Sequence, residues 1–160
     1  MKNLLLLLVS LLLISCGPDL DDAKELDAIL EEALPKDKAQ LKGPRNEELY
    51  YEANKQEPYT GWLKRMHANG QVYELGKFKD GKSHGPVFTW YENGQKSLEV
   101  EMKDGKVIAA KAWLPDGLRC PVTNIQDGTG SLITYDNDGK EDTRHLFEKG
   151  MFTEVYQTNN

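Results

Sequence analysis

The side chains of this 160-residue sequence best suited to chemistry are three histidines, His67, His84 and His145, and two cysteines, Cys16 and Cys120. No two of the histidines stand at the close spacing that paired zinc ligands usually share. A nucleophilic Cys120 would need the fold to bring it against a histidine. We therefore predict a protein that is not an enzyme, with no catalytic residue, no metal site and no cofactor. An envelope hydrolase built on Cys120 is the alternative.

The segment Asp136-Asn137-Asp138-Gly139 superficially resembles a calcium loop. In the register of that loop, Thr134 and His145 would fall where carboxylate ligands are needed. Asp138-Gly139 is also one of a series of recurring Asn-Gly and Asp-Gly pairs. A hairpin turn therefore explains this segment better than a calcium loop does.

The N-terminus is typical of an export signal. A basic start is followed by an apolar run over residues 4–14, broken only by Ser10. At ~1.5 Å per residue, this run covers about half of a ~30 Å hydrocarbon core, so it is too short to span a bilayer. It fits the apolar region of a secretory signal peptide.

The next residues, Leu13-Ile14-Ser15-Cys16, resemble the lipobox of bacterial lipoproteins. The resemblance implies cleavage before Cys16, diacylglycerol on its thiol and a further acyl chain, such as palmitate, on its amine. Two or more chains anchor a protein stably. We therefore predict a signal peptide at residues 1–15 and a lipid anchor in the cell envelope. In a diderm organism, Gly17 favours the outer over the inner membrane. The alternative is a plain secretory signal with an incidental cysteine.

The charge balance limits the partners. The formal net charge is −6 and becomes −7 when Lys2 is removed with the signal. An acidic chain lacks the basic surface that nucleic acids require, and it is not drawn to anionic lipids. With Cys16 lipidated, Cys120 has no partner within the chain. It is expected to be a small buried side chain or, alternatively, to pair between chains.

Residues 16–45 are expected to form a lipid-anchored acidic helix and a linker. Apolar residues recur at spacings of three and four over residues 19–34, and Pro35 follows. This pattern predicts a short amphipathic helix that packs on the folded domain or, alternatively, docks a partner helix. Residues 36–45 are polar, contain Gly43-Pro44 and are predicted to be a linker. The folded domain is expected over residues 46–160.

A repeat with a period of 24, 23 and then 22 residues organises that domain. Each copy has a starting glycine, a second glycine nine residues later and a third eleven residues after that; Ile108 replaces the starting glycine of the third copy. The glycines are Gly61, Gly70, Gly81, Gly85, Gly94, Gly105, Gly117, Gly128, Gly130, Gly139 and Gly150. All but one of the second and third glycines follow Asn or Asp, a pairing that favours type I′ hairpin turns. We predict an all-β repeat: an elongated antiparallel meander of about eight strands in one twisted ribbon.

These repeats resemble the bacterial variant of the MORN repeat. The resemblance rests on residues 57–61, on Gly85-Pro86-Val87-Phe88-Thr89-Trp90-Tyr91-Glu92-Asn93-Gly94-Gln95-Lys96 and on residues 103–106, and it covers roughly residues 57–150. It is strong in two copies, and the third copy departs from it around Cys120-Pro121. The resemblance implies a non-enzymatic binding or scaffolding module. Many bacterial members carry the label of antitoxin components.

Aromatic residues spread along the predicted strands are the candidate binding residues. They are Trp62, Tyr73, Trp90, Tyr91, Trp113 and Tyr135. Each could instead belong to the core of the repeats. We expect a protein-interaction or scaffold module in the cell envelope with a protein partner, and the first alternative is an antitoxin-like or immunity protein that neutralises a toxin. A binder of envelope glycans is the further alternative.

Overall fold

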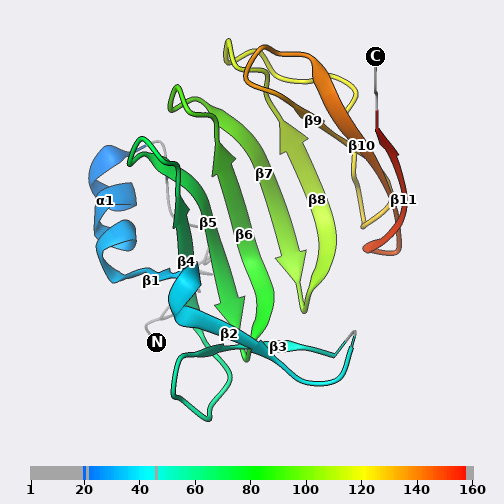
Figure 1. The fold of residues 1–160 in the computed structure, drawn as a ribbon. Coiled ribbons are helices and arrows are strands. Elements are labelled where there is room, and N and C mark those ends of the chain that lie inside the picture. Colours follow the sequence, from blue (N-terminus) through cyan, green and yellow to red (C-terminus); the bar gives the residue numbers. More distant parts are fainter. Residues whose placement is uncertain (1–19, 21, 46, 158–160) are drawn as a thin grey trace, which may run out of the picture.

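The computed structural model describes residues 20, 22–45 and 47–157 (Figure 1). The predicted signal peptide, Cys16 and Gly17 lie outside the described residues. Most of the described chain is β-strand, with one short α-helix and a largely antiparallel meander. The prediction of an all-β fold is confirmed at this level.

Helix α1 (Ala23–Glu32) begins where Asp22 caps it. The Asp22 carboxylate accepts hydrogen bonds from the backbone N–H groups of Lys24 (2.8 Å) and Glu25 (3.3 Å), which satisfies donors that a helix start leaves open. The predicted helix is confirmed, although it ends at Glu32, because the next residues form a strand. Its apolar stripe packs on the sheet.

The segment expected to be a linker is instead structured. It contains β1 (Leu34–Pro35), a 3₁₀ turn (Lys36–Lys38) and β2 (Ala39–Lys42), which pairs with β3 (Leu49–Glu52) as a separate hairpin. Glycine, proline and charged residues suggested a loop, but backbone pairing with β3 outweighs that local preference. This hairpin becomes one wall of the site described below.

The main sheet has six strands in the order β1-β4-β5-β6-β7-β8. Strands β4 (Gly61–Met66), β5 (Val72–Lys79), β6 (Lys82–Trp90), β7 (Lys96–Lys103) and β8 (Lys106–Ala112) form an antiparallel meander, and the two-residue β1 pairs with β4 in parallel. A second sheet has the order β11-β10-β9, from β9 (Gly130–Tyr135), β10 (Glu141–Glu148) and β11 (Met151–Gln157).

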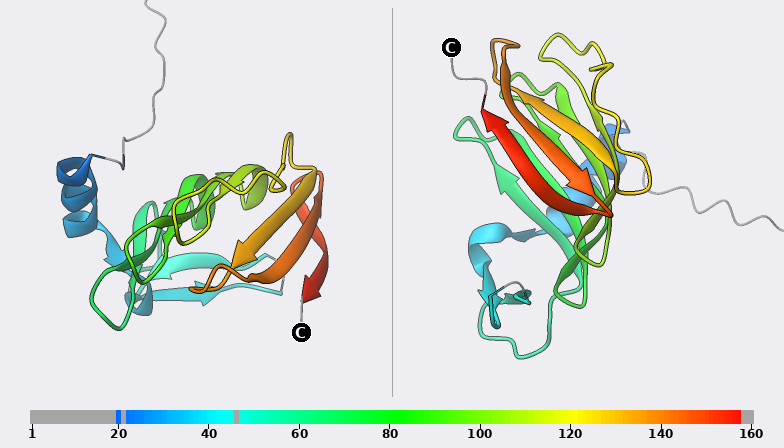
Figure 2. Two further views of the ribbon diagram at one scale, coloured as in Figure 1. Left: turned by 90° about the horizontal axis from the view of Figure 1, so that it is seen from above. Right: turned by 90° about the vertical axis from the view of Figure 1, so that its right-hand side faces the viewer.

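The prediction of a single continuous ribbon was therefore wrong, although β4 to β11 do provide the expected eight strands. The break falls in the irregular third copy. Residues 113–129 contain no named strand, and their Cys120 N–H donates to the Ala112 carbonyl. The carbonyl of Ile108 accepts from Gly128, and that of Gly150 accepts from Val107. Turns and loop thus cover the edge of β8, and the second sheet leaves at an angle (Figure 2).

The hairpins use two turn types. In the later turn of each copy, Asp80, Asp104, Asp127 and Lys149 have φ of 48–52° and the glycines that follow have φ of 76–80°, as type I′ requires. In the earlier turns, only the glycine has a positive φ, of 80–86°. Those turns are type I turns followed by a left-handed glycine, with a bulge in the neighbouring ladder. The type I′ prediction holds for the later turns and was wrong for the earlier ones, whose loops hold one more residue.

The two faces of the main sheet bury different cores. On the convex face, Leu75, Phe88 and Trp90 pack with Leu26, Ile29 and Leu30 of α1. On the other face, Val100, Ala110 and Ala112 pack with Ile133 and Leu132 of β9. Strand alternation separates these sets, because successive side chains point to opposite sides. Only the convex core is covered by the helix.

Candidate functional site

A hollow lies on the concave face of the main sheet, opposite α1. Main-sheet residues form its floor, Glu48 and Tyr50 at β3 line one side, and Leu132 of β9 and Met151 of β11 line the other. Figure 2 shows the β2–β3 hairpin and the β9–β11 sheet on the same side of the main sheet. Residues on its surface belong to two neighbouring pockets. We call this hollow the trough, and its two parts the lower and upper pockets.

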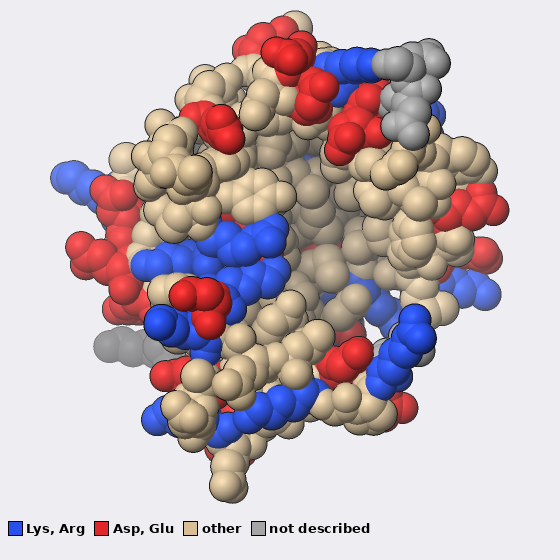
Figure 3. All heavy atoms as spheres, in the orientation of Figure 1, with Lys and Arg blue, Asp and Glu red and all other residues tan. Residues whose placement is uncertain are grey.

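The lower pocket has a volume of about 710 Å³ and an apolar floor, with charged residues such as Glu48, Glu74 and Lys106 around it. Its floor is formed by Phe78, Val87, Val100 and Met102, and Leu132 closes it on the side of the second sheet. Figure 3 looks into the trough, whose middle is lined mostly by uncharged residues with charged groups around it. The lower pocket therefore exposes apolar surface that the described chain does not cover.

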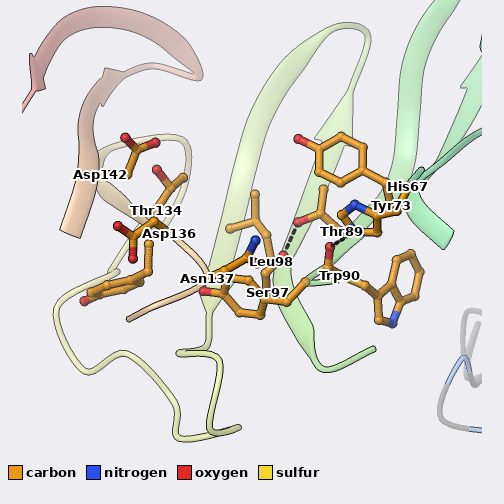
Figure 4. A pocket seen from close by; sticks show the side chains of 12 residues that line it. His67, Tyr73, Thr89, Trp90, Ser97, Leu98, Thr134, Asp136, Asn137 and Asp142 are labelled. Carbon is orange, nitrogen blue, oxygen red and sulfur yellow. Dashed lines mark hydrogen bonds between the residues drawn. The ribbon is translucent and has the colours of Figure 1, made fainter. Parts of the chain in front are cut away.

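The upper pocket is smaller, about 380 Å³, and more polar (Figure 4). It is lined by His67, Tyr73, Thr89, Trp90, Tyr91, Ser97, Leu98, Thr134, Tyr135, Asp136, Asn137 and Asp142. The ring of Tyr73 is the most exposed of its aromatic groups, at 36%. Trp90 and Tyr91 are only 6% exposed, so most of their surface packs in the protein.

The floors of the two pockets lie along the same strands. The register pairs Thr89 with Leu98 and Val87 with Val100, so these four side chains share a face of β6 and β7. Thr89 and Leu98 line the upper pocket, and Val87 and Val100 line the lower one. The trough thus changes from apolar to polar along these strands.

Ion pairs tie the β2–β3 side of the trough to its floor. Glu74 of β5 contacts Lys36 Nζ at 3.1 Å and Arg65 Nη2 at 2.9 Å. Near the other end of the main sheet, Asp104 accepts from His84 Nδ1 at 2.9 Å, and this hydrogen bond lowers the pKa of the Asp104 carboxyl. Glu74 and Asp104, which line the lower pocket, are thus both engaged within the protein.

Cys120 is buried, with 1% exposure, in agreement with its expected role as a small core residue. Its Sγ lies 3.0 Å from the Tyr135 hydroxyl and accepts from Thr123 Oγ1 at 3.6 Å. Burial pushes the pKa of Cys120 upward, but the hydrogen bonds of Tyr135 and Thr123 outweigh it, and the pKa ends below its ordinary value. Burial likewise raises the pKa of Tyr135.

The three histidines form hydrogen bonds with residues other than Cys120. His67 Nε2 contacts the Trp90 carbonyl, His84 contacts Asp104, and His145 Nε2 contacts Thr143 Oγ1. The pairing of Cys120 with a histidine that the hydrolase alternative requires is thus absent over residues 22–45 and 47–157. The same residues hold no group of three or more side chains able to bind a metal.

A Gly-x-Ser-x-Gly spacing was missed in the sequence. It is Gly81-Lys82-Ser83-His84-Gly85. Such a motif positions a nucleophile only at a sharp turn from strand to helix. Here Ser83 and His84 are successive residues of β6, so their side chains point to opposite faces. Ser83 lines the lower pocket, and its buried Oγ has no hydrogen-bond partner in the described structure.

Asp136-Asn137-Asp138-Gly139 forms the hairpin turn that was expected. The Asp136 Oδ1 atom accepts from the backbone N–H groups of Asp138 (3.0 Å) and Lys140 (2.9 Å). Equivalent turns stack on one another: Asn69 Nδ2 donates to the Glu92 carbonyl and Asn93 Nδ2 to the Pro115 carbonyl. The second glycine of each copy is thus a residue of these turns and the third belongs to the later turns, whereas the starting glycines Gly61, Gly85 and Gly130 lie in strands, so their prediction as turn residues was wrong.

The structure gathers four of the six candidate aromatics at one place. Tyr73, Trp90, Tyr91 and Tyr135 line the upper pocket. Trp62 and Trp113 lie outside both pockets. Lys77 Nζ lies 5.7 Å from the Trp62 ring centroid, and Lys96 Nζ lies 5.6 Å from the Trp113 ring centroid. Sequence spacing could not foresee this grouping, because Tyr135 belongs to the second sheet.

Comparison of the chain with protein-family models, curated proteins and solved structures finds no match. The resemblance to MORN repeats therefore stays a prediction. Over the part of the chain that is described, no helix has both the length and the apolar character needed to cross a membrane.

Proposed function

We propose that this protein is a non-catalytic lipoprotein of the cell envelope that binds a partner protein in its trough. The observation that supports this most is the apolar floor of the lower pocket, which stays open while the opposite face of the same sheet is covered by α1. Concave pockets with a largely apolar floor are common binding sites. Lipid on Cys16 would hold the trough at a membrane surface.

The trough fits a segment of polypeptide. The partly exposed apolar floor of the lower pocket matches a segment that carries apolar anchor side chains.

The finer fold assignment belongs to the same proposal. The chain would hold about four copies of a MORN-like hairpin repeat, the third of them altered. The recurrent turn geometry and the hydrogen bonds between stacked turns support this. A repeat array presents a long surface to a partner, as other repeat proteins do.

Site-specific photo-crosslinking in cells tests the proposal. A benzophenone amino acid would replace Met102, which lines the trough, or its neighbour Glu101, which points to the other face of β7. We expect a discrete adduct from position 102 and none from position 101. The same adduct should be lost or weakened with Cys16→Ser. Equal adducts from both positions, or none from position 102, would contradict a trough that binds protein.

A further inference from the structure

The upper pocket has a lining that suits a ligand other than a polypeptide. It combines an exposed tyrosine ring with hydroxyl, amide and carboxylate groups in one small cavity. The geometry points to a second binding site here, which takes one uncharged pyranose ring of a glycan. This site goes beyond the proposed protein-binding function and does not depend on it.

Tyr73 supplies the stacking platform. The Arg65 guanidinium carbon lies 4.6 Å from its ring centroid, and the His67 ring meets it edge-on at 5.0 Å. These contacts fix the ring, although more than a third of the residue stays exposed. A sugar ring presents C–H groups on its flat side, and a rigid aromatic ring offers them apolar contact at little entropic cost.

Hydrogen-bonding groups stand across the pocket from that platform. Figure 4 places Thr134, Asp136 and Asp142 on the side opposite His67 and Tyr73. Asp136 uses Oδ1 to cap its turn, which leaves Oδ2 outside those bonds. A carboxylate oxygen accepts from sugar hydroxyls, and a side-chain amide such as that of Asn137 both donates and accepts.

The floor adds hydroxyl groups. Thr89 Oγ1 and Ser97 Oγ lie 2.7 Å apart and hydrogen bond to each other. One of these oxygens donates in that bond, so the pair keeps further capacity to donate and accept. Sugar hydroxyls have the same dual character. The pocket therefore offers an apolar platform and several polar contacts, the combination expected of a small-ligand site.

Charge and size restrict the ligand. Asp136 and Asp142 line the pocket, no lysine or arginine does, and the Arg65 guanidinium on the Tyr73 ring is paired with Glu74, so a uronic acid or a phosphorylated sugar would meet repulsion. At about 380 Å³, the cavity is at the small end of the ~300–1,000 Å³ range of ligand sites. It holds one ring, with the rest of the glycan outside.

Saturation-transfer NMR on the full-length protein tests this site, in a detergent without a sugar headgroup. The probes are the methyl pyranosides of glucose, galactose and mannose, N-acetylglucosamine, and galacturonic acid as the charged control. At about 10 mM, a ligand with a Kd near 1 mM saturates most of the protein. We expect transfer to at least one neutral sugar, with the strongest signals on the C–H groups of one ring face, and none to galacturonic acid.

Three substitutions at two positions separate binding from folding. Tyr73→Ala should weaken sugar binding roughly fivefold to tenfold, and Tyr73→Phe should retain most of it, because the ring is kept. Tyr156→Ala, at an exposed tyrosine outside the pocket, is the matched control and should leave binding unchanged. No transfer to any neutral sugar, equal transfer to galacturonic acid, or equal loss in the Tyr156 variant would overturn the proposal. Because none of these variants changes Met102, the crosslink at position 102 reports separately on the protein-binding function.

Discussion

The two faces of the main sheet are made of the same strands but are used differently. On the convex face, Leu75 and Phe88 are nearly inaccessible because α1 packs over them. On the concave face, Val87 and Met102 remain partly exposed at the bottom of the trough. The alternating pattern of the strands provides apolar residues for both faces. Both faces therefore contribute to the core of the fold, and the concave face also keeps partly exposed apolar residues.

The largest difference should come from truncating one residue on each face. Phe88→Ala removes a ring from the covered core and should cost about 3–5 kcal/mol in the free energy of unfolding. Met102→Ala, in the open trough, should cost about 1 kcal/mol or less, since that side chain is only partly buried. Urea unfolding of both variants measures this. Equal losses would mean that the two faces contribute alike to stability.

A glycine at the base of the second wall should have the next largest effect. Gly128 has φ of +76°, and an added Cβ would lie 2.4 Å from the Gly150 backbone nitrogen. Gly128→Ala should cost about 2–4 kcal/mol, from backbone strain plus that clash. Gly105, at φ of +80° in the same turn type, has open space around it, so Gly105→Ala should cost about 1–2 kcal/mol, from strain alone.

Thermal or urea unfolding distinguishes these two variants. A Gly128 variant as stable as the Gly105 variant would show that the close approach of the turns does not hold the second sheet in place. The wall of the trough would then have another origin.

The smallest effect on the free energy of unfolding should come from the buried Tyr91 at alkaline pH. Burial raises the pKa of Tyr91 from its ordinary 10.0 to about 12, helped by nearby Asp136 and Asp116. Its hydroxyl donates to the Trp113 carbonyl at 2.7 Å. A pKa that is higher in the folded chain stabilises the fold fully below pH 10, and this contribution is lost as the pH rises to about 12.

Unfolding free energies at a series of pH values check this. The wild-type protein should lose on the order of 2 kcal/mol between pH 10 and 12 from this group. Tyr91→Phe should start lower, by about 1 kcal/mol for the lost hydrogen bond, and fall less steeply. Parallel curves for the two proteins would show that Tyr91 is not held in a dry environment.

The regular parts of the chain could be predicted from the sequence, because local turn chemistry determines them. Asp-Gly pairs such as Asp80-Gly81 and Asp104-Gly105 predict hairpins at their positions. The apolar spacing before Pro35 predicts the helix. What the helix covers could not be predicted, because β6 carries apolar residues on both faces, Val87 on one and Phe88 and Trp90 on the other.

The trough itself depends on contacts between distant residues. Residues 39–42 form a strand only because residues 49–52 pair with them. The second sheet turns away because Cys120 and the turns at Gly128 and Gly150 occupy the edge of β8. Nothing in the spacing of Tyr73 and Tyr135 indicates that they line one pocket. Such long-range arrangements leave no periodic signal in a sequence.

Methionine oxidation in cells tests the central claim most directly, because the chain carries its own probes. Met102 and Met151 line the lower pocket, whereas Met66 is 49% exposed and lies outside both pockets. A brief peroxide pulse converts accessible methionine to its sulfoxide, which mass spectrometry quantifies at each position. The purified protein should be oxidised at all three positions. In intact cells, a bound partner should protect Met102 and Met151 and leave Met66 reactive. Equal oxidation of Met102 in cells and in the purified protein would contradict an occupied trough.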